Sequence, residues 1–314
     1  MAPASQIARA VQVLRAGRLV AFPTETVYGL GADASSAQAV ARLYAVKGRP
    51  ADHPVIVHFA SPALAFQWAA SVPESAARLA DRFWPGPLTL IVERGEKAKD
   101  FVTGGQDSVG LRVPSHPVAQ RLLAEFGGAL AAPSANRFGR VSPTSARHVR
   151  DDLGADVDLV LEGGESQVGI ESTIVDLSCG TPVLLRPGAI SLLALQDVLG
   201  AEVQEKGASS PRHSGGLDRH YAPRTPARLV ETFMLDQEIA QHGEKVAVLA
   251  FSRPDERVDY WLRMPREPRA YAQRLYAALR ELDSSGCELI LVEAPPRQAE
   301  WAAVLDRLRR ACAA

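Results

Sequence analysis

The segment Ala21–Ala34, AFPTETVYGLGADA, places two threonines, a glutamate and a tyrosine directly after a short apolar run. Leu19–Phe22 is typical of a buried strand, and Pro23 cannot donate a ladder hydrogen bond, so the chain is expected to leave the sheet there. In open α/β folds, ligands bind at the loops that follow strands. Hydroxyls and a carboxylate in such a loop predict recognition of a polar small molecule, and a glycine-rich turn held by threonine side chains is the structural alternative.

A second group of polar residues is basic. Lys47 and Arg49 flank a glycine at the expected end of a helix, where cations also complement the helix dipole without any ligand. His53 and His58 follow closely, and strand alternation over residues 55–59 puts His58 on the face opposite the valines. A buried strand histidine is more often structural, but with the two cations it predicts a positively biased pocket edge.

Arg112 stands among apolar residues in the expected strand Val109–Val113. A guanidinium there needs an anionic partner, which is either an acidic side chain of the protein or a carboxylate of a ligand, and both readings stay open. Several hydroxyls, an amide and a further arginine follow other strand-like runs. Each is compatible with a cap or turn and with ligand binding: Ser134, Asn136, Ser142, Ser172 and Arg186.

The common catalytic motifs are absent from the sequence. It has no G-x-x-x-x-G-K-[ST], no G-x-S-x-G, no H-E-x-x-H and no zinc-type spacing of Cys and His. Gly29–Ala34 matches G-x-G-x-x-A but stands too far beyond the preceding strand for a dinucleotide fingerprint. Cations and hydroxyls without a nucleophile suit the orientation of charged small molecules and the stabilisation of phosphoryl charge.

Composition sets broad limits. The 314 residues are 46% hydrophobic, which is enough for two domains, and 35 basic against 36 acidic side chains give no global attraction to nucleic acid or anionic membranes. Cys179, Cys287 and Cys312 are few and odd in number, which predicts a reducing, cytoplasmic setting without a disulfide framework. The N-terminus has a helical rhythm and no apolar run is long enough for a bilayer, so we expect a protein that is neither exported nor membrane-embedded.

Alternating helix and strand patterns predict an α/β fold with a mixed sheet over residues 1–198. Residues 199–223 contain a Gly-, Ser- and Pro-rich stretch that is typical of a linker. Residues 224–314 carry a second α/β pattern, with strands expected at 246–251 and 289–292 and helices at 270–282 and 301–311. This part is expected to form a smaller domain.

Taken in order, PTETVYGLGADA, KGRP with His58 downstream, PGPLTLIV, VGLRVPSHP, APSAN followed by SPTSA, GIESTIVDL and LRPGAI resemble the YrdC-like family over almost all of residues 1–195. HYAP at His220–Pro223 and the region after it resemble the two-domain threonylcarbamoyl-AMP synthases of that family. The resemblance implies a twisted α/β domain with a positively charged cavity, joined by the linker to a smaller Rossmann-like domain.

The resemblance also implies a reaction. L-Threonine, bicarbonate and ATP would give threonylcarbamoyl-AMP and pyrophosphate, with Mg²⁺ bridging phosphate oxygens and no dedicated metal site on the protein. The product would pass to a separate transferase complex for threonylcarbamoyladenosine (t6A) modification of tRNAs that read ANN codons, so tRNA is an indirect partner.

Carried over position by position, the resemblance implies the site residues. Threonine would be held by Thr26, His58, Arg112, Ala132 and Ser172, with Arg112 on its carboxylate. ATP would be held by Arg49, His53, Ser108, Ser134, Asn136, Ser142, Arg186 and Tyr221. Lys47 and Arg49 are the implied catalytic residues near the phosphates, and Tyr221, in the linker, would fold back over the nucleotide.

Two other functions are compatible with parts of this sequence. Hydrogenase maturation proteins share this domain for carbamoyl transfer, but they also carry acylphosphatase and zinc-finger modules that this sequence lacks. A tRNA or double-stranded RNA binding module without nucleotide turnover is the alternative from another class. The neutral net charge and the lack of a dense Lys/Arg stripe argue against it.

Overall fold

The computed structural model describes residues 3–207, 210–258 and 260–313, so residues 208 and 209 of the expected linker lie outside the described residues. The chain forms two compact units. The first comprises Met1–Phe138, Pro143–Gln167 and Glu171–Gly216, and the second comprises Gly139–Ser142, Val168–Ile170 and Leu217–Ala314.

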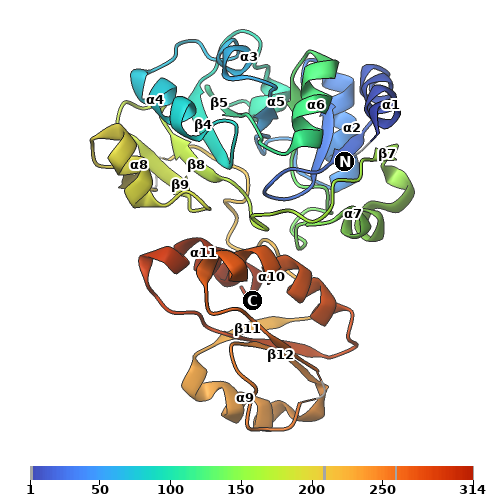
Figure 1. The fold of residues 1–314 in the computed structure, drawn as a ribbon, viewed down its shortest axis with the longest axis vertical. Coiled ribbons are helices and arrows are strands. Elements are labelled where there is room, and N and C mark those ends of the chain that lie inside the picture. Colours follow the sequence, from blue (N-terminus) through green and yellow to red (C-terminus); the bar gives the residue numbers. More distant parts are fainter. Residues whose placement is uncertain (1–2, 208–209, 259, 314) are drawn as a thin grey trace. The chain divides into compact units, whose positions relative to one another are not determined.

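The first unit is built from helices and strands that alternate along the chain (Figure 1). Its helices are α1 (Ala4–Arg15), α2 (Ala37–Lys47), α3 (Pro62–Phe66), α4 (Glu74–Phe83), α5 (Asp100–Thr103), α6 (Pro117–Phe126), α7 (Ala146–Leu153) and α8 (Leu192–Leu199). Its strands are β1 (Val20–Phe22), β2 (Gly29–Asp33), β3 (Val57–His58), β4 (Leu88–Glu93), β5 (Ser108–Arg112), β6 (Leu130–Ala131), β7 (Leu159–Val160), β8 (Thr173–Asp176), β9 (Val183–Arg186) and β10 (Gln204–Glu205).

These strands form one ten-stranded sheet in the order β10-β9-β8-β4-β5-β3-β6-β2-β1-β7. Parallel pairs such as β3 with β5 and β4 with β8 adjoin antiparallel pairs such as β4 with β5. The predicted α/β fold with a mixed sheet is therefore confirmed. The expected strands Leu19–Phe22 and Val109–Val113 are present as β1 and β5 with bounds that differ by one residue, and the expected strand 55–59 is shorter and forms β3.

Alternation along the strands separates two sheet faces. On one face, inward residues such as Val57, Leu90 and Leu111 pack in the main core with α2, α4, α7 and α8. On the other face, α1 and α6 lie side by side and pack over β1, β6 and β7 (Figure 1). Over β3, β4, β5 and β8, this second face instead carries His58, Thr89, Ile91, Ser108, Gly110, Arg112 and Ile174, which we call the open face.

Local sequence explains why Lys47 and Arg49 stand where they do. The Ser36 side chain caps α2 by accepting a hydrogen bond from Ala39 N, as expected for a helix start. Gly48 ends the helix in the left-handed conformation with φ 64°, which glycine adopts without steric cost. The turn places Lys47 in the last helical turn and Arg49 just outside it.

The second unit has a four-stranded parallel sheet in the order β11-β14-β12-β13. Its elements are β11 (Ala227–Val230), α9 (Leu235–His242), β12 (Val246–Ala250), β13 (Tyr260–Arg263), α10 (Pro268–Asp283), β14 (Leu289–Glu293) and α11 (Ala302–Ala311). Figure 1 shows α10 and α11 on one face of this sheet and α9 on the other, as in doubly wound folds. The expected strands and helices are present, and β11, β13 and α9 are additional.

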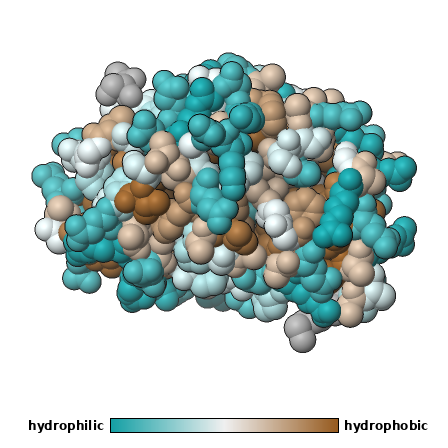
Figure 2. Space-filling model, turned by 90° about the horizontal axis from the view of Figure 1, so that it is seen from above, coloured by the Kyte–Doolittle hydropathy of each residue, from teal (hydrophilic) through white to brown (hydrophobic). Residues whose placement is uncertain are grey.

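Hydrophobic residues on the face shown in Figure 2 occur as separate small patches among hydrophilic ones. Among the described residues, no helix combines the length and the apolar character needed to cross a bilayer.

Candidate functional site

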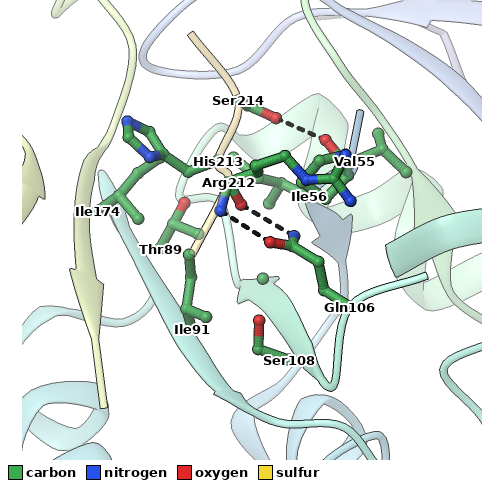
Figure 3. Close-up of a pocket in the computed structure, with 12 residues that line it drawn as sticks. Val55, Ile56, Thr89, Ile91, Gln106, Ser108, Ile174, Arg212, His213 and Ser214 are labelled. Atoms are coloured by element: carbon green, nitrogen blue, oxygen red, sulfur yellow. Dashed lines mark hydrogen bonds between the residues drawn. The ribbon is translucent and has the colours of Figure 1, made fainter. Parts of the chain in front are cut away.

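A pocket lies on the open face of the first unit. Thr89, Ile91, Ser108 and Ile174 line it from the sheet, and Arg212–Ser214 line it from the other side (Figure 3). Gly110 also lines it, so the middle of β5 contributes no side chain to fill this space. The pocket is thus closed by an irregular segment of the chain, and polar side chains of the sheet face into it.

The loop between β1 and β2 brings Glu25 and Thr26 to Arg112 on the open face, whereas Tyr28 packs in the main core and donates its hydroxyl to Gly164 O at 2.8 Å. Thr24 Oγ1 donates to Val27 O at 2.6 Å and accepts from Val27 N at 3.2 Å, so this hydroxyl serves the turn itself. Thr26 Oγ1 lies 2.8 Å from Thr24 Oγ1. The structural alternative therefore holds for Thr24, whereas the next two residues contact Arg112.

Arg112 has an acidic partner within the protein. Its Nη2 donates to Glu25 Oε1 at 2.6 Å and to Thr26 Oγ1 at 2.9 Å, and both members of the ion pair are buried. The other oxygen of Glu25 accepts a hydrogen bond from Ser115 N at 3.0 Å. A ligand carboxylate would therefore meet a guanidinium that is already held on one nitrogen.

His58 stands beside Arg112, because the two residues are paired in register on β3 and β5. Its Nδ1 lies 3.3 Å from Ile56 O, which favours the tautomer with the proton on that nitrogen. Burial, followed by the charge of Arg112, lowers the pKa of the imidazole to about 3. His58 is therefore neutral near pH 7, and its Nε2 is available as an acceptor.

Ser172, just before β8, connects two predicted subsites. Arg186 at the end of β9 donates from Nε to Ser172 O at 3.0 Å and from Nη2 to Ser172 Oγ at 3.1 Å. Thr89 Oγ1 lies 2.8 Å from the same hydroxyl. The residue expected to bind threonine thus contacts an arginine expected to bind ATP. Thr89 was missed, although a threonine between leucines in LTLIV was a usable signal.

Lys47 is buried beneath the loop that carries the APSAN segment. Its Nζ donates to Ser134 O and Asn136 O, each at 2.6 Å. Burial lowers the pKa of this ammonium well below its ordinary value, and the nearby Arg49 lowers it further. The loop containing Ser134 and Asn136 is therefore held in place by a cation.

Arg49 lies beside the same loop, with its guanidinium 5.9 Å from the Tyr44 ring centroid and 5.7 Å from that of Phe138. It donates from Nη2 to Pro54 O at 2.7 Å. His53 packs edge-on against Phe138 at 5.4 Å, and burial followed by the charge of Arg49 lowers its pKa. Arg49 therefore contacts Pro54, which lines the pocket, and both Arg49 and His53 pack against Phe138.

The segment Pro211–Gly216 approaches both arginines through Ser214. Arg186 Nη1 donates to Ser214 O at 2.9 Å, and Arg49 Nη2 lies 3.4 Å from Ser214 Oγ. Gln106 and the backbone of Arg212 exchange two hydrogen bonds, of 2.7 and 3.0 Å, which anchor the segment (Figure 3). Sequence reasoning missed Gln106 and Ser214, because nothing in a Gly- and Ser-rich stretch indicates where it lies.

The remaining predicted residues divide between the units. Ser108 opens β5 on the open face, and Ala132 donates its N–H to Ile56 O at 3.0 Å next to His58. Ser142 and Tyr221 belong to the second unit. There, Arg307 lies over the Tyr221 ring at 5.4 Å and Tyr276 packs against it at 5.7 Å, so the ring is buried within that unit.

Over the described ranges, no group of three or more His, Cys, Asp and Glu side chains is arranged to hold a metal ion. The cationic side chains and hydroxyls of the site are groups that can bind anions.

Comparison with known proteins covers nearly the whole chain. A family model of the Sua5, YciO and YrdC proteins, described as telomere recombination, matches residues 12–188. A second model, described as the C-terminal domain of threonylcarbamoyl-AMP synthase, matches residues 190–313.

Individual relatives are similar over the same extent. The threonylcarbamoyl-AMP synthase of Pyrococcus abyssi is 40% identical over 312 residues, covering 95% of this chain and 91% of the relative. That of Bacillus subtilis is 39% identical, covering 98% of this chain and 92% of the relative. The crystal structure of P. abyssi Sua5 complexed with L-threonine has a TM-score of 0.91 at 39% identity and covers 98% of this chain and 94% of that chain.

The environment of His58 predicts a pH-dependent stability. Because the pKa of the folded imidazole is about 3 against an ordinary 6.5, the unfolded chain takes up a proton first as the pH falls. Between pH 6.5 and 5, urea unfolding should therefore show a larger loss of stability for the wild type than for His58→Gln. Equal losses in the two proteins would mean that the folded imidazole titrates normally.

Proposed function

Since this chain belongs to the Sua5/YciO/YrdC family and also carries the C-terminal domain of the longer members, we propose that it synthesises L-threonylcarbamoyl-AMP from L-threonine, bicarbonate and ATP. The observation that carries this conclusion is the match to threonylcarbamoyl-AMP synthases over nearly the full length of both chains. Threonine and ATP are its substrates, and the use of bicarbonate follows from the proposed chemistry.

We propose that threonine binds on the open face, where His58 of β3 lies beside Arg112 of β5. Arg112 binds its carboxylate, and Thr26, Ser172 and the neutral His58 provide hydrogen-bonding groups, with the backbone of Ala132 nearby. This assignment is supported by the contact of Arg112 with Thr26 and by its register with His58. An imidazole that stays uncharged adds no further positive charge next to the guanidinium.

We propose that ATP is bound by Arg49, His53, Ser108, Ser134, Asn136 and Arg186. Lys47 and Arg49 are the proposed catalytic residues near the phosphates. The proximity of both arginines to Ser214 supports a shared pocket for them. Ser142 and Tyr221 remain proposed nucleotide contacts, and residues 199–223 the proposed linker between domains 1–198 and 224–314. Mg²⁺ is proposed to enter with ATP, held by phosphate oxygens.

The reaction requires that the substrates be held in position, because the attacking groups come from the substrates and not from the protein. The threonine amine forms a bond to the carbon of bicarbonate, water leaves, and a carbamate remains. A carbamate oxygen then bonds to the α-phosphorus while the bond to the pyrophosphate oxygen breaks. Cations near the phosphates stabilise the charge of that transition state, and hydroxyls on the sheet orient the amino acid.

The product is proposed to pass transiently to a threonylcarbamoyl transferase complex for tRNA modification. A cytoplasmic location is proposed from Cys179, Cys287 and Cys312, which are all unpaired thiols. RNA binding without turnover is not favoured, because the relatives that match the full chain are named as synthases.

The direct test is pyrophosphate release by the purified chain, with the nucleotide product identified by mass spectrometry after supplying labelled threonine. Release is expected only when threonine, bicarbonate and ATP are all present, because the carbamate must form before it attacks the α-phosphorus. Pyrophosphate release that is indifferent to threonine would contradict the proposal.

Separate subsites predict separate kinetic effects. Arg112→Lys keeps the charge but loses the forked geometry, so the KM for threonine should rise on the order of tenfold and the KM for ATP should change little. Arg49→Lys should have the opposite pattern. Arg94→Lys, in a surface ion pair with Asp100, is the control and should change neither constant. Equal, small effects of all three substitutions would argue against the two subsites.

A further inference from the structure

Glu25 is a buried carboxylate in the site to which the proposed reaction assigns no role. We propose that Glu25 is a positioning residue for threonine, which orients the Arg112 guanidinium so that its remaining N–H groups face the substrate carboxylate. This inference rests on the proposed function, and within that function it assigns to Glu25 an effect on the affinity for threonine.

The Arg112 guanidinium has one nitrogen that already binds the protein and another that remains available to a ligand. Both side-chain contacts of Arg112 in the described structure, to Glu25 and to Thr26, are made by the single atom Nη2. Arg112 Nε is buried and has no hydrogen-bond partner there, and the whole residue is only 4% exposed. A buried N–H donor without an acceptor is costly, and a bound carboxylate would satisfy it.

Glu25 is itself held firmly enough to orient its partner. Its Oε1 accepts from Arg112 at 2.6 Å, and its Oε2 accepts from the backbone N–H of Ser115 at 3.0 Å. The carboxylate therefore bridges the loop after β1 and the segment after β5. Both oxygens are in use, which limits rotation of the side chain and, through it, of the guanidinium.

The charges of Arg112 and Glu25 also support a positioning role for Glu25. Arg112 cannot lose its proton, so a buried guanidinium needs a compensating negative charge when no ligand is bound. Glu25 supplies that charge, and the resulting pair has no net charge. Threonine enters as a zwitterion that is also neutral overall, so its binding next to Arg112 buries no net charge.

The test compares Glu25→Gln, Glu25→Asp and a matched control in steady-state kinetics. The amide of Glu25→Gln removes the charge and one acceptor oxygen, so the KM for threonine should rise on the order of tenfold or more. The KM for ATP and the kcat at saturating threonine should stay within about threefold. Glu25→Asp keeps the charge but has a shorter side chain, so its KM for threonine should lie between those of the wild type and Glu25→Gln.

Asp158 offers the matched control, because it also joins a backbone amide to an arginine. It accepts from Leu19 N at 2.9 Å and from Arg42 Nη2 at 2.9 Å, beside β7 and away from the pocket. Asp158→Asn should leave the KM for threonine unchanged even if it lowers the melting temperature. Circular dichroism of each variant separates loss of folding from loss of affinity.

The proposal is overturned if Glu25→Gln leaves the KM for threonine unchanged, or if it lowers kcat/KM for threonine and ATP by the same factor. Should Glu25→Gln fail to fold, Glu25→Asp decides alone, since an unchanged KM for threonine in that folded variant would equally overturn it. Titration of threonine into the enzyme by calorimetry follows the same affinity without turnover. A wild type that binds threonine but makes no product would count against the proposed function and not against this role of Glu25.

Discussion

Three basic residues of the site are almost completely buried: Lys47, Arg112 and Arg186 are 3%, 4% and 4% exposed. A cation in that position must recover its hydrogen bonds from the protein. The acceptors come from segments far away in the sequence: carbonyls of Ser134 and Asn136 for Lys47, Glu25 and Thr26 for Arg112, and Ser172 for Arg186. The same bonds that keep these cations buried therefore hold the loops of the open face together.

The nature of the acceptor distinguishes the surroundings of Arg112 from those of Lys47. Arg112 meets a carboxylate and forms a pair without net charge, which suits a zwitterionic amino acid. Lys47 donates to two backbone carbonyls, which accept its hydrogen bonds without adding negative charge, and burial lowers the pKa of its ammonium. The hydroxyl of Ser172 contacts both Arg186 and Thr89 on the open face.

Much of this arrangement was predictable from the sequence. Apolar alternation placed most strands of the first unit, and the helix end at Gly48 placed Lys47 and Arg49. The partner of Arg112 was not predictable, because a strand sequence requires an anion without saying whether it is a side chain 87 residues away or a ligand. The positions of Ser214 and Tyr221 were not predictable either, since a linker has no periodic pattern and its contacts depend on what it packs against.

The central claim is that segments distant in sequence converge on the open face to hold threonine through Arg112. It is tested most directly by a crystal structure of this chain with L-threonine. The account predicts that the threonine carboxylate lies within hydrogen-bond distance of Arg112, with the Glu25–Arg112 pair intact and His58 beside the substrate. Threonine bound elsewhere, with the Arg112 Nε still unpartnered, would contradict it.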